Sequence, residues 1–124
     1  MEFFKEIEKI DITVDALKSQ LQIATLPVHC KSINNIISDN GNYGEIYCVW
    51  GQFTVSREVI RNGVRFALLN CPHALAWTVA LHTNRNTIII HCTIDNQQEN
   101  EEFVESIEQF VSDWKIGLEH WLQL

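Results

Sequence analysis

The sequence predicts an α+β fold in which an N-terminal helix, an antiparallel meander of four to five strands and a long C-terminal amphipathic helix follow one another. Three observations lead to this prediction. Apolar residues recur at three- and four-residue steps over residues 99–122, β-branched segments separated by turn residues fill residues 28–94, and helical spacing returns near the N-terminus. With 124 residues, 46% of them hydrophobic, the chain fits a single domain, residues 1–124, with one core.

The C-terminal helix is predicted from one apolar stripe, because residues three and four apart share a helix face. The opposite face carries acidic side chains such as Glu101, Glu105 and Glu108, which we expect to face solvent. Asn96, followed three residues later by Glu99, predicts a capping box at the start of the helix. The stripe consists of Phe103, Val104, Ile107, Phe110, Val111, Trp114, Leu118, Trp121 and Leu122.

Two helical segments are predicted before the sheet. The first ten residues have an apolar spacing that suits a short helix, and Thr13 suits the N-cap of a second helix over residues 14–24. Pro27 is expected to close this region, and a β pattern is expected from Val28 onward. The apolar residues of the first segment are Phe3, Phe4, Ile7 and Ile10.

The strands are predicted from residue type and turn signals. Residues 45–55 are aromatic and β-branched, and Gly51 suggests a bulge or a close backbone approach. Asn62-Gly63 predicts a hairpin between residues 57–60 and 64–69, since both residues tolerate positive φ. A further hairpin joins residues 75–82 and 87–94 through a loop of two or four residues.

The last hairpin has a predicted register that makes one of its faces wholly apolar, and this face is the natural seat of the C-terminal helix. The other face carries small and mixed side chains, so it could face solvent, line a groove or contact another subunit. The predicted apolar pairs are Leu81 with Ile88, Val79 with Ile90, Trp77 with Cys92, and Leu75 with Ile94.

The net charge of −7 argues against nucleic acid or an anionic membrane as partner, because both need a positive patch. Apolar runs stay well below the ~20 residues of a membrane span, and the first residues do not resemble a secretory signal, so we expect a cytoplasmic protein. Phosphate loops, dinucleotide fingerprints and hydrolase motifs are missing, and no cofactor is expected.

Histidine lies beside or near cysteine three times, as His29-Cys30, Cys71-Pro72-His73 and His91-Cys92. Adjacent strand residues point to opposite faces, so only Cys71 and His73 could share a metal ion or form a thiol–imidazole pair. We favour a tight turn between two strands for Asn70-Cys71-Pro72-His73, because turn chemistry alone explains the Asn and the Pro. We therefore expect buried, reduced cysteines, no metal site and no catalytic residue.

Two functions remain open. The first is a non-enzymatic, acidic protein-interaction module that forms a homodimer and binds a protein partner. The alternative is a cup between sheet and helix that binds a small apolar ligand or acts as a lyase or cyclase. An enclosed pocket would favour the cup, and a filled core with an apolar patch outside would favour the module. The residues predicted for a ligand or partner surface are Trp50, Phe53, Phe66, His82, His91 and Trp121.

Overall fold

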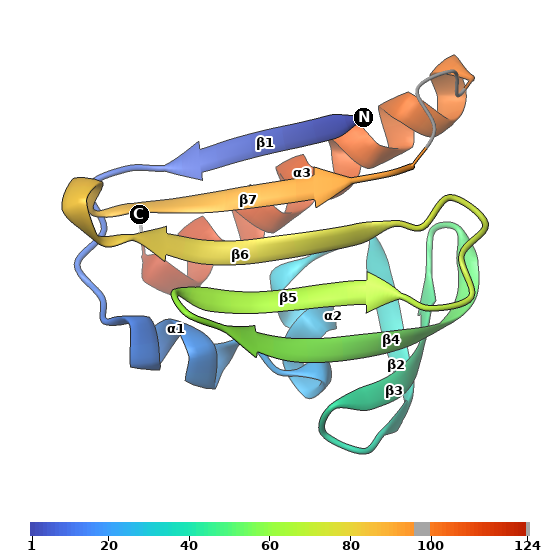
Figure 1. Ribbon diagram of the computed structural model, residues 1–124, viewed down its shortest axis with the longest axis horizontal. Helices are drawn as coiled ribbons and strands as arrows, with labels where there is room; N and C mark the ends of the chain where they lie inside the picture. The colour runs from blue at the N-terminus through green and yellow to red at the C-terminus, as the bar shows by residue number, and fades with distance from the viewer. Residues whose placement is uncertain (96–99, 124) are drawn as a thin grey trace.

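The computed structural model describes residues 1–95 and 100–123, and its seven strands form an antiparallel sheet. From β2 to β7 each strand pairs with the next along the chain, which confirms the predicted meander, and β1 adds to the edge beside β7 (Figure 1). The sheet has seven strands rather than the predicted four to five. The strands are β1 (Glu2–Ile7), β2 (Ile33–Asp39), β3 (Tyr43–Cys48), β4 (Gly51–Ile60), β5 (Gly63–Leu68), β6 (Ala76–His82) and β7 (Thr87–Thr93).

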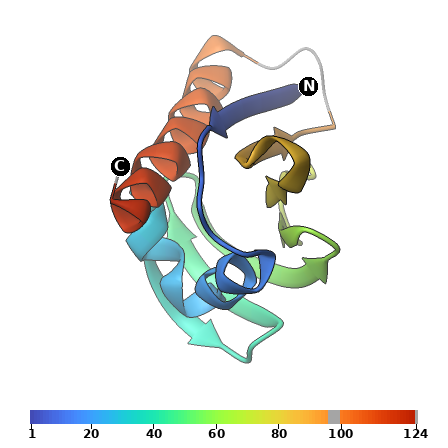
Figure 2. The ribbon, with the colours of Figure 1, turned by 90° about the vertical axis from the view of Figure 1, so that its left-hand side faces the viewer.

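The α-helices are α1 (Val14–Gln20), α2 (Leu26–His29) and α3 (Glu101–Leu122), and short 3-10 turns lie at Ile23–Thr25 and Thr83–Arg85. The sheet is strongly curved and α3 runs along its concave side, with α2 packed between α3 and β2 (Figure 2). Within the described residues, no helix is both long and apolar enough to cross a membrane. Helix α3 covers the concave face of the sheet, as predicted.

The predicted helix over the first ten residues is wrong, because Glu2–Ile7 forms strand β1. Its side chains alternate between exposed and more buried positions, with Phe3 and Ile7 turned toward the core. The strand pairs antiparallel with β7, from Glu2 opposite Thr93 to Ile7 opposite Ile88. This pairing across the whole length of the chain supplies the ladder hydrogen bonds that outweigh the local helical spacing.

The second predicted helix is confirmed in part. Thr13 is the N-cap of α1, and its hydroxyl accepts a hydrogen bond from the Ala16 N–H at 3.0 Å. The helix ends at Gln20 instead of residue 24. Pro27 does not close the region but lies in the first turn of α2, where a missing N–H costs nothing. The β pattern expected from Val28 is wrong for that reason, and β2 begins at Ile33.

Glycines explain two features of the sheet. Gly51, at φ +117°, follows a two-residue turn that splits the predicted strand 45–55 into β3 and β4. The hairpin at Asn62-Gly63 is confirmed, but neither residue has a positive φ. Gly63 is needed instead because a Cβ there would lie 2.0 Å from the carbonyl oxygen of Val79 on the neighbouring strand. Close approach of β5 and β6 is the physical reason for this glycine.

The predicted register of the last hairpin is confirmed for three pairs, from Leu81 opposite Ile88 to Trp77 opposite Cys92. The loop is the four-residue alternative, residues 83–86, and its last residue Asn86 adopts the left-handed conformation. All side chains of the predicted apolar face are buried, and so are the central residues of the α3 stripe. The buried stripe residues are Ile107, Phe110, Val111, Trp114 and Leu118.

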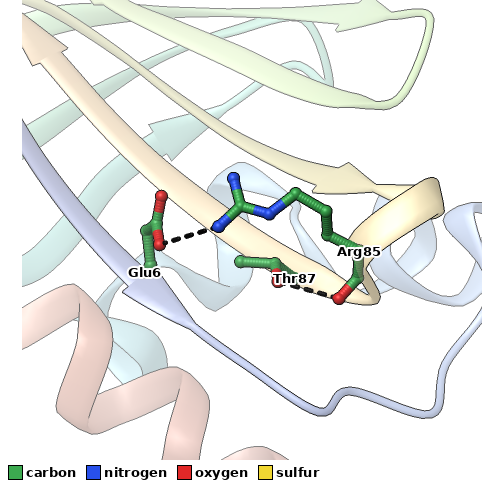
Figure 3. A network of polar contacts seen from close by, with 3 residues as sticks. All are labelled: Glu6, Arg85 and Thr87. Carbon is green, nitrogen blue, oxygen red and sulfur yellow. Dashed lines mark hydrogen bonds and ion pairs between the residues drawn. The ribbon is translucent and has the colours of Figure 1, made fainter.

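The end of β1 is held at the turn between β6 and β7. The Arg85 guanidinium lies 3.5 Å from a carboxylate oxygen of Glu6, and the Thr87 hydroxyl donates to the Arg85 carbonyl at 3.0 Å (Figure 3). The ion pair is well exposed, so water screens it and backbone pairing remains the main attachment of this edge.

The start of α3 is capped by Asn100, whose side chain accepts from the Phe103 N–H at 2.8 Å. The capping box predicted at Asn96 and Glu99 lies outside the described residues. Glu101 and Glu102 occupy the first turn, where negative charge is favourable next to the helix dipole.

Candidate functional site

A continuous chain of aromatic rings fills the space between α3 and the sheet. The chain starts with His73 and Phe103, whose ring centroids are 4.2 Å apart, and passes through Trp50 to Phe110. Phe110 meets Trp77 edge-on at 4.9 Å. It continues from Trp77 to Phe66, Trp114, His29 and Trp121, with neighbouring centroids 5.3–6.3 Å apart. The interior is therefore filled by side chains, and its rings connect both ends of α3.

One end of this ring chain opens to the surface in a hollow of about 240 Å³, which we call the mouth. Three segments far apart in the sequence meet there: the β3–β4 turn, the loop between β5 and β6, and the first turn of α3. Among the residues that the structure describes, the lining contains no Asp, Glu, Lys or Arg. The lining residues are Trp50, Phe53, Cys71, Pro72, His73, Leu75 and Phe103.

The indole groups of the ring chain differ in how their N–H groups are used. At the mouth, Trp50 Nε1 donates to the Ser106 hydroxyl at 2.8 Å, and that hydroxyl donates onward to the Phe103 carbonyl at 2.6 Å. Trp77 and Trp114 are 1% and 0% exposed, and neither Nε1 has a hydrogen-bond partner among the described residues. Buried donors in native proteins usually have partners, so these two N–H groups are unusual.

His29 lies at the other end of the ring chain, fully buried between α1, α2 and α3. The Gln20 amide nitrogen lies 2.9 Å from its Nε2. Burial lowers the pKa of His29, and the backbone of Gly117 opposes part of that shift. Charging this imidazole would therefore disfavour the packing of α2 on α3.

The cysteines are all free thiols. Burial raises the pKa of Cys92 to about 12 and raises that of Cys30 and Cys48 as well, so these three are poor nucleophiles. Cys71 is half-buried in the mouth, beside Pro72 and His73. Within the described part of the chain, no group of three or more His, Cys, Asp or Glu side chains is arranged to hold a metal ion.

A second, larger groove of about 800 Å³ lies outside the ring chain, along the contact between α2 and α3. Its floor contains Asp113, 9% exposed, which accepts hydrogen bonds from the Ser32 hydroxyl at 2.6 Å and the Gln109 amide at 2.7 Å. These bonds satisfy the buried carboxylate. Three apolar side chains along the groove are well exposed, namely Val28 (71%), Val49 (55%) and Ile116 (62%).

The residues predicted for a ligand or partner surface fall in separate places. Trp50 and Phe53 lie together in the mouth, and Phe66 is buried deeper in the ring chain, stacked on Trp77. Trp121 packs edge-on against His29 at the opposite end, 5.8 Å between centroids.

The two predicted histidines lie away from the ring chain. His91 is on the outer face of the sheet, where it stacks on Phe4 at 4.3 Å and its Nε2 lies 2.9 Å from a Glu2 carboxylate oxygen. His82 is exposed at the end of β6, next to the β6–β7 turn. Both histidines belong to the face of the last hairpin for which the sequence left three roles open: facing solvent, lining a groove or contacting another subunit.

Sequence reasoning missed five members of the mouth, namely Cys71, Pro72, His73, Leu75 and Phe103. Phe103 and Leu75 had been assigned to packing, and Cys71 and His73 to a turn or a metal pair. Turn residues beside apolar residues predict each loop individually, but they do not predict which loops lie next to one another. Only the order of strands in the sheet brings these loops to the same end of α3.

Comparisons with known proteins agree on the fold. No protein-family model matches the sequence, and no curated protein matches it either. Among solved structures, an uncharacterised protein from Bacillus thuringiensis has a TM-score of 0.69 at 16% identity, with 100% of both chains covered. A START superfamily protein from Mycobacterium smegmatis has a TM-score of 0.65 at 10% identity, covering 98% of this chain and 97% of that one. A protein from Nitrosospira multiformis has a TM-score of 0.53 at 11% identity, covering 92% of this chain and 93% of that one. The chain therefore has a START-like fold.

Proposed function

We propose that this protein binds a small apolar molecule, with the mouth as the point of contact. The core between α3 and the sheet is filled and is not the enclosed cup that the sequence suggested. The observation that carries the proposal is therefore the open mouth, a hollow lined by four aromatic rings and Leu75 at one end of the helix–sheet interface. Its volume of about 240 Å³ exceeds the ~150 Å³ of an engineered cavity that holds benzene. A one- or two-ring molecule is the size that this space suits.

The lining chemistry supports an apolar and uncharged ligand. None of the seven described mouth residues carries a carboxylate, ammonium or guanidinium group, so a charged molecule would lose its hydration without gaining a charged partner from them. Aromatic faces offer large contact areas at low cost in side-chain entropy. The solved structures with this fold share only 10–16% sequence identity with the chain, so the lining of the mouth and not the fold indicates the ligand chemistry.

The test is a titration with the neutral two-ring fluorescent probe 1-naphthylamine, read by probe emission and by the melting temperature. We expect saturable, one-to-one binding and a concentration-dependent rise in melting temperature. Phe53→Glu places a charge in the mouth and should abolish binding, whereas the control Ile116→Glu in the α2–α3 groove should leave it unchanged. Circular dichroism spectra of both variants serve as the control that they fold like the wild type.

Absence of saturable binding to the folded protein would refute the proposal. Loss of binding in Ile116→Glu with retention in Phe53→Glu would also refute it, since the probe would then occupy the groove.

A second candidate function rests on the exposed apolar side chains of the α2–α3 groove. Val28, Val49 and Ile116 would be covered if a second copy of the chain docked there, as expected for a homodimer interaction module. Size-exclusion chromatography with light scattering tests this: a dimer at micromolar concentration that Ile116→Glu converts to a monomer supports it, and a monomeric wild type refutes it.

A further inference from the structure

We propose that the ligand is a neutral, planar aromatic molecule carrying a hydrogen-bond acceptor, and that this acceptor is bound by the indole N–H of Trp77. This inference rests on the proposed function, because it specifies the chemistry of a molecule entering by the mouth. The observation behind it is separate: two indole N–H groups without partners lie within the ring chain.

Trp77 is the unpartnered donor nearest the mouth. Leu75, which lines the mouth, is the preceding residue on the same inward face of the sheet, so about 7 Å separates the two along the chain. On the helix side, Phe103 lines the mouth, and Phe110 follows two turns further along the same stripe. Phe110 contacts both Trp50 and Trp77, which makes it the ring between the mouth and the donor.

An indole N–H is a donor only, so a ligand that satisfies it must bring an acceptor. A carbonyl or an aromatic ring nitrogen meets this need without introducing charge. An anion is disfavoured, because the mouth lining has no basic side chain of Lys or Arg type and the chain carries a net charge of −7. A planar molecule can stack on one of the two rings, Trp50 or Phe103, and meet the other edge-on, because their planes are inclined by 64°.

Trp50 provides a matched comparison within the same chain. It lines the mouth, but its N–H is already donated to Ser106. A ligand acceptor therefore gains nothing from Trp50, although its ring contributes contact area. Replacing either tryptophan by phenylalanine removes one N–H and keeps an aromatic ring, so the two variants differ in whether a free donor is lost.

The experiment compares 1-indanone with indane, which have the same bicyclic frame and differ in one carbonyl. We expect wild type to prefer 1-indanone, and this preference to fall about tenfold in Trp77→Phe, the size of one hydrogen bond. Trp50→Phe should weaken both ligands and leave the preference intact. In ¹H–¹⁵N spectra, the Trp77 indole resonance, assigned from Trp77→Phe, should move downfield with 1-indanone and not with indane.

Equal binding of the two bicycles, with no change of preference in Trp77→Phe, would overturn the inference and leave apolar binding at the mouth standing. The same holds if the fluorescent probe binds and neither bicycle does. A Trp77 indole signal that is already downfield without ligand and does not move would show a buried water as its partner, which also overturns it. If the fluorescent probe and both bicycles fail to bind, the proposed function itself is refuted.

Discussion

Gly117→Ala tests the close contact between α2 and α3. Gly117 lies inside α3, where it packs on α2. A Cβ at this position would lie 1.9 Å from the carbonyl oxygen of His29 and 2.5 Å from its carbonyl carbon. Both atoms belong to backbone, so no side-chain rotation can relieve the overlap, and the two helices would have to separate by roughly 1 Å.

The expected magnitude follows from two opposing effects. Alanine is favoured over glycine in a helix interior by about 1 kcal/mol, so propensity alone predicts a more stable protein. Overpacking typically costs 1–3 kcal/mol, and a backbone overlap with rigid, fully buried neighbours lies at or above the upper end of that range. The displaced segment carries Leu26, His29 and Cys30, all 0% exposed. We expect a net destabilisation of about 2 kcal/mol or more, a loss of roughly 6–10 °C in melting temperature.

Urea unfolding followed by tryptophan fluorescence measures the effect, with Ile116→Ala as the control. Ile116 is the preceding residue of the same helix and is 62% exposed, so its replacement should change stability by less than about 0.5 kcal/mol. A Gly117→Ala protein as stable as wild type, or more stable, would refute the close packing of α2 on α3 and with it the burial of His29.

Three further predictions concern the core, the surface and pH. Trp114→Ala should lower the free energy of unfolding by about 3–5 kcal/mol in urea titrations, because a fully buried indole is removed; near wild-type stability would contradict docking of α3 by this face. Glu105→Ala should shift the urea midpoint very little, since Glu105 is exposed, and a large loss would show that the acidic face contacts the fold. The lowered pKa of His29 means that the unfolded chain binds the extra proton first, so its contribution to stability is complete above pH ~6.5 and falls below it, toward the folded-state pKa. Urea midpoints measured from pH 7.5 to 5.5 should show this slope in wild type and a shallower one in His29→Gln; identical slopes would contradict it.

The elements that the sequence predicted well are those in which local pattern and tertiary contact agree. The α3 stripe repeats over several turns, and the residues expected at its centre are buried. The register of the β6–β7 hairpin followed from alternation alone, because a shift by one residue would have turned Trp77 and Val79 away from the core.

The failures occur where a distant partner decides the local structure. Phe3, Phe4 and Ile7 have a spacing that suits a helix, yet their segment pairs with a strand more than 80 residues away. Pro27 was taken for a terminator, although proline is equally at home in a first helical turn. The Asn62-Gly63 hairpin was predicted correctly, but the reason given for it, a positive φ, was wrong. The glycine is required by the close approach of β5 to β6. None of these partners can be identified from the residues themselves.

Of the seven residues that line the mouth, the sequence had singled out two for a ligand or partner surface, Trp50 and Phe53, for the same reason. Trp50 and Phe53 lie on one hairpin, so their proximity to each other is local, whereas Phe103 joins them only after the chain has built the rest of the sheet. The sequence therefore indicated which rings were available and not which of them meet.

The rings that would receive a ligand are also those that hold the fold together. Phe110 and Trp77 are in edge contact at 4.9 Å, which leaves no room for a third ring between them. A ligand whose acceptor reaches the Trp77 N–H must therefore displace Phe110, whereas a ligand without an acceptor can stay in the mouth against Trp50 and Phe103. Truncating these rings to alanine would lower stability and binding together, and the two effects could not be separated. Replacing tryptophan by phenylalanine keeps a ring in the core, so a selective loss of preference for 1-indanone would report the hydrogen bond itself and place the acceptor at the deeper position.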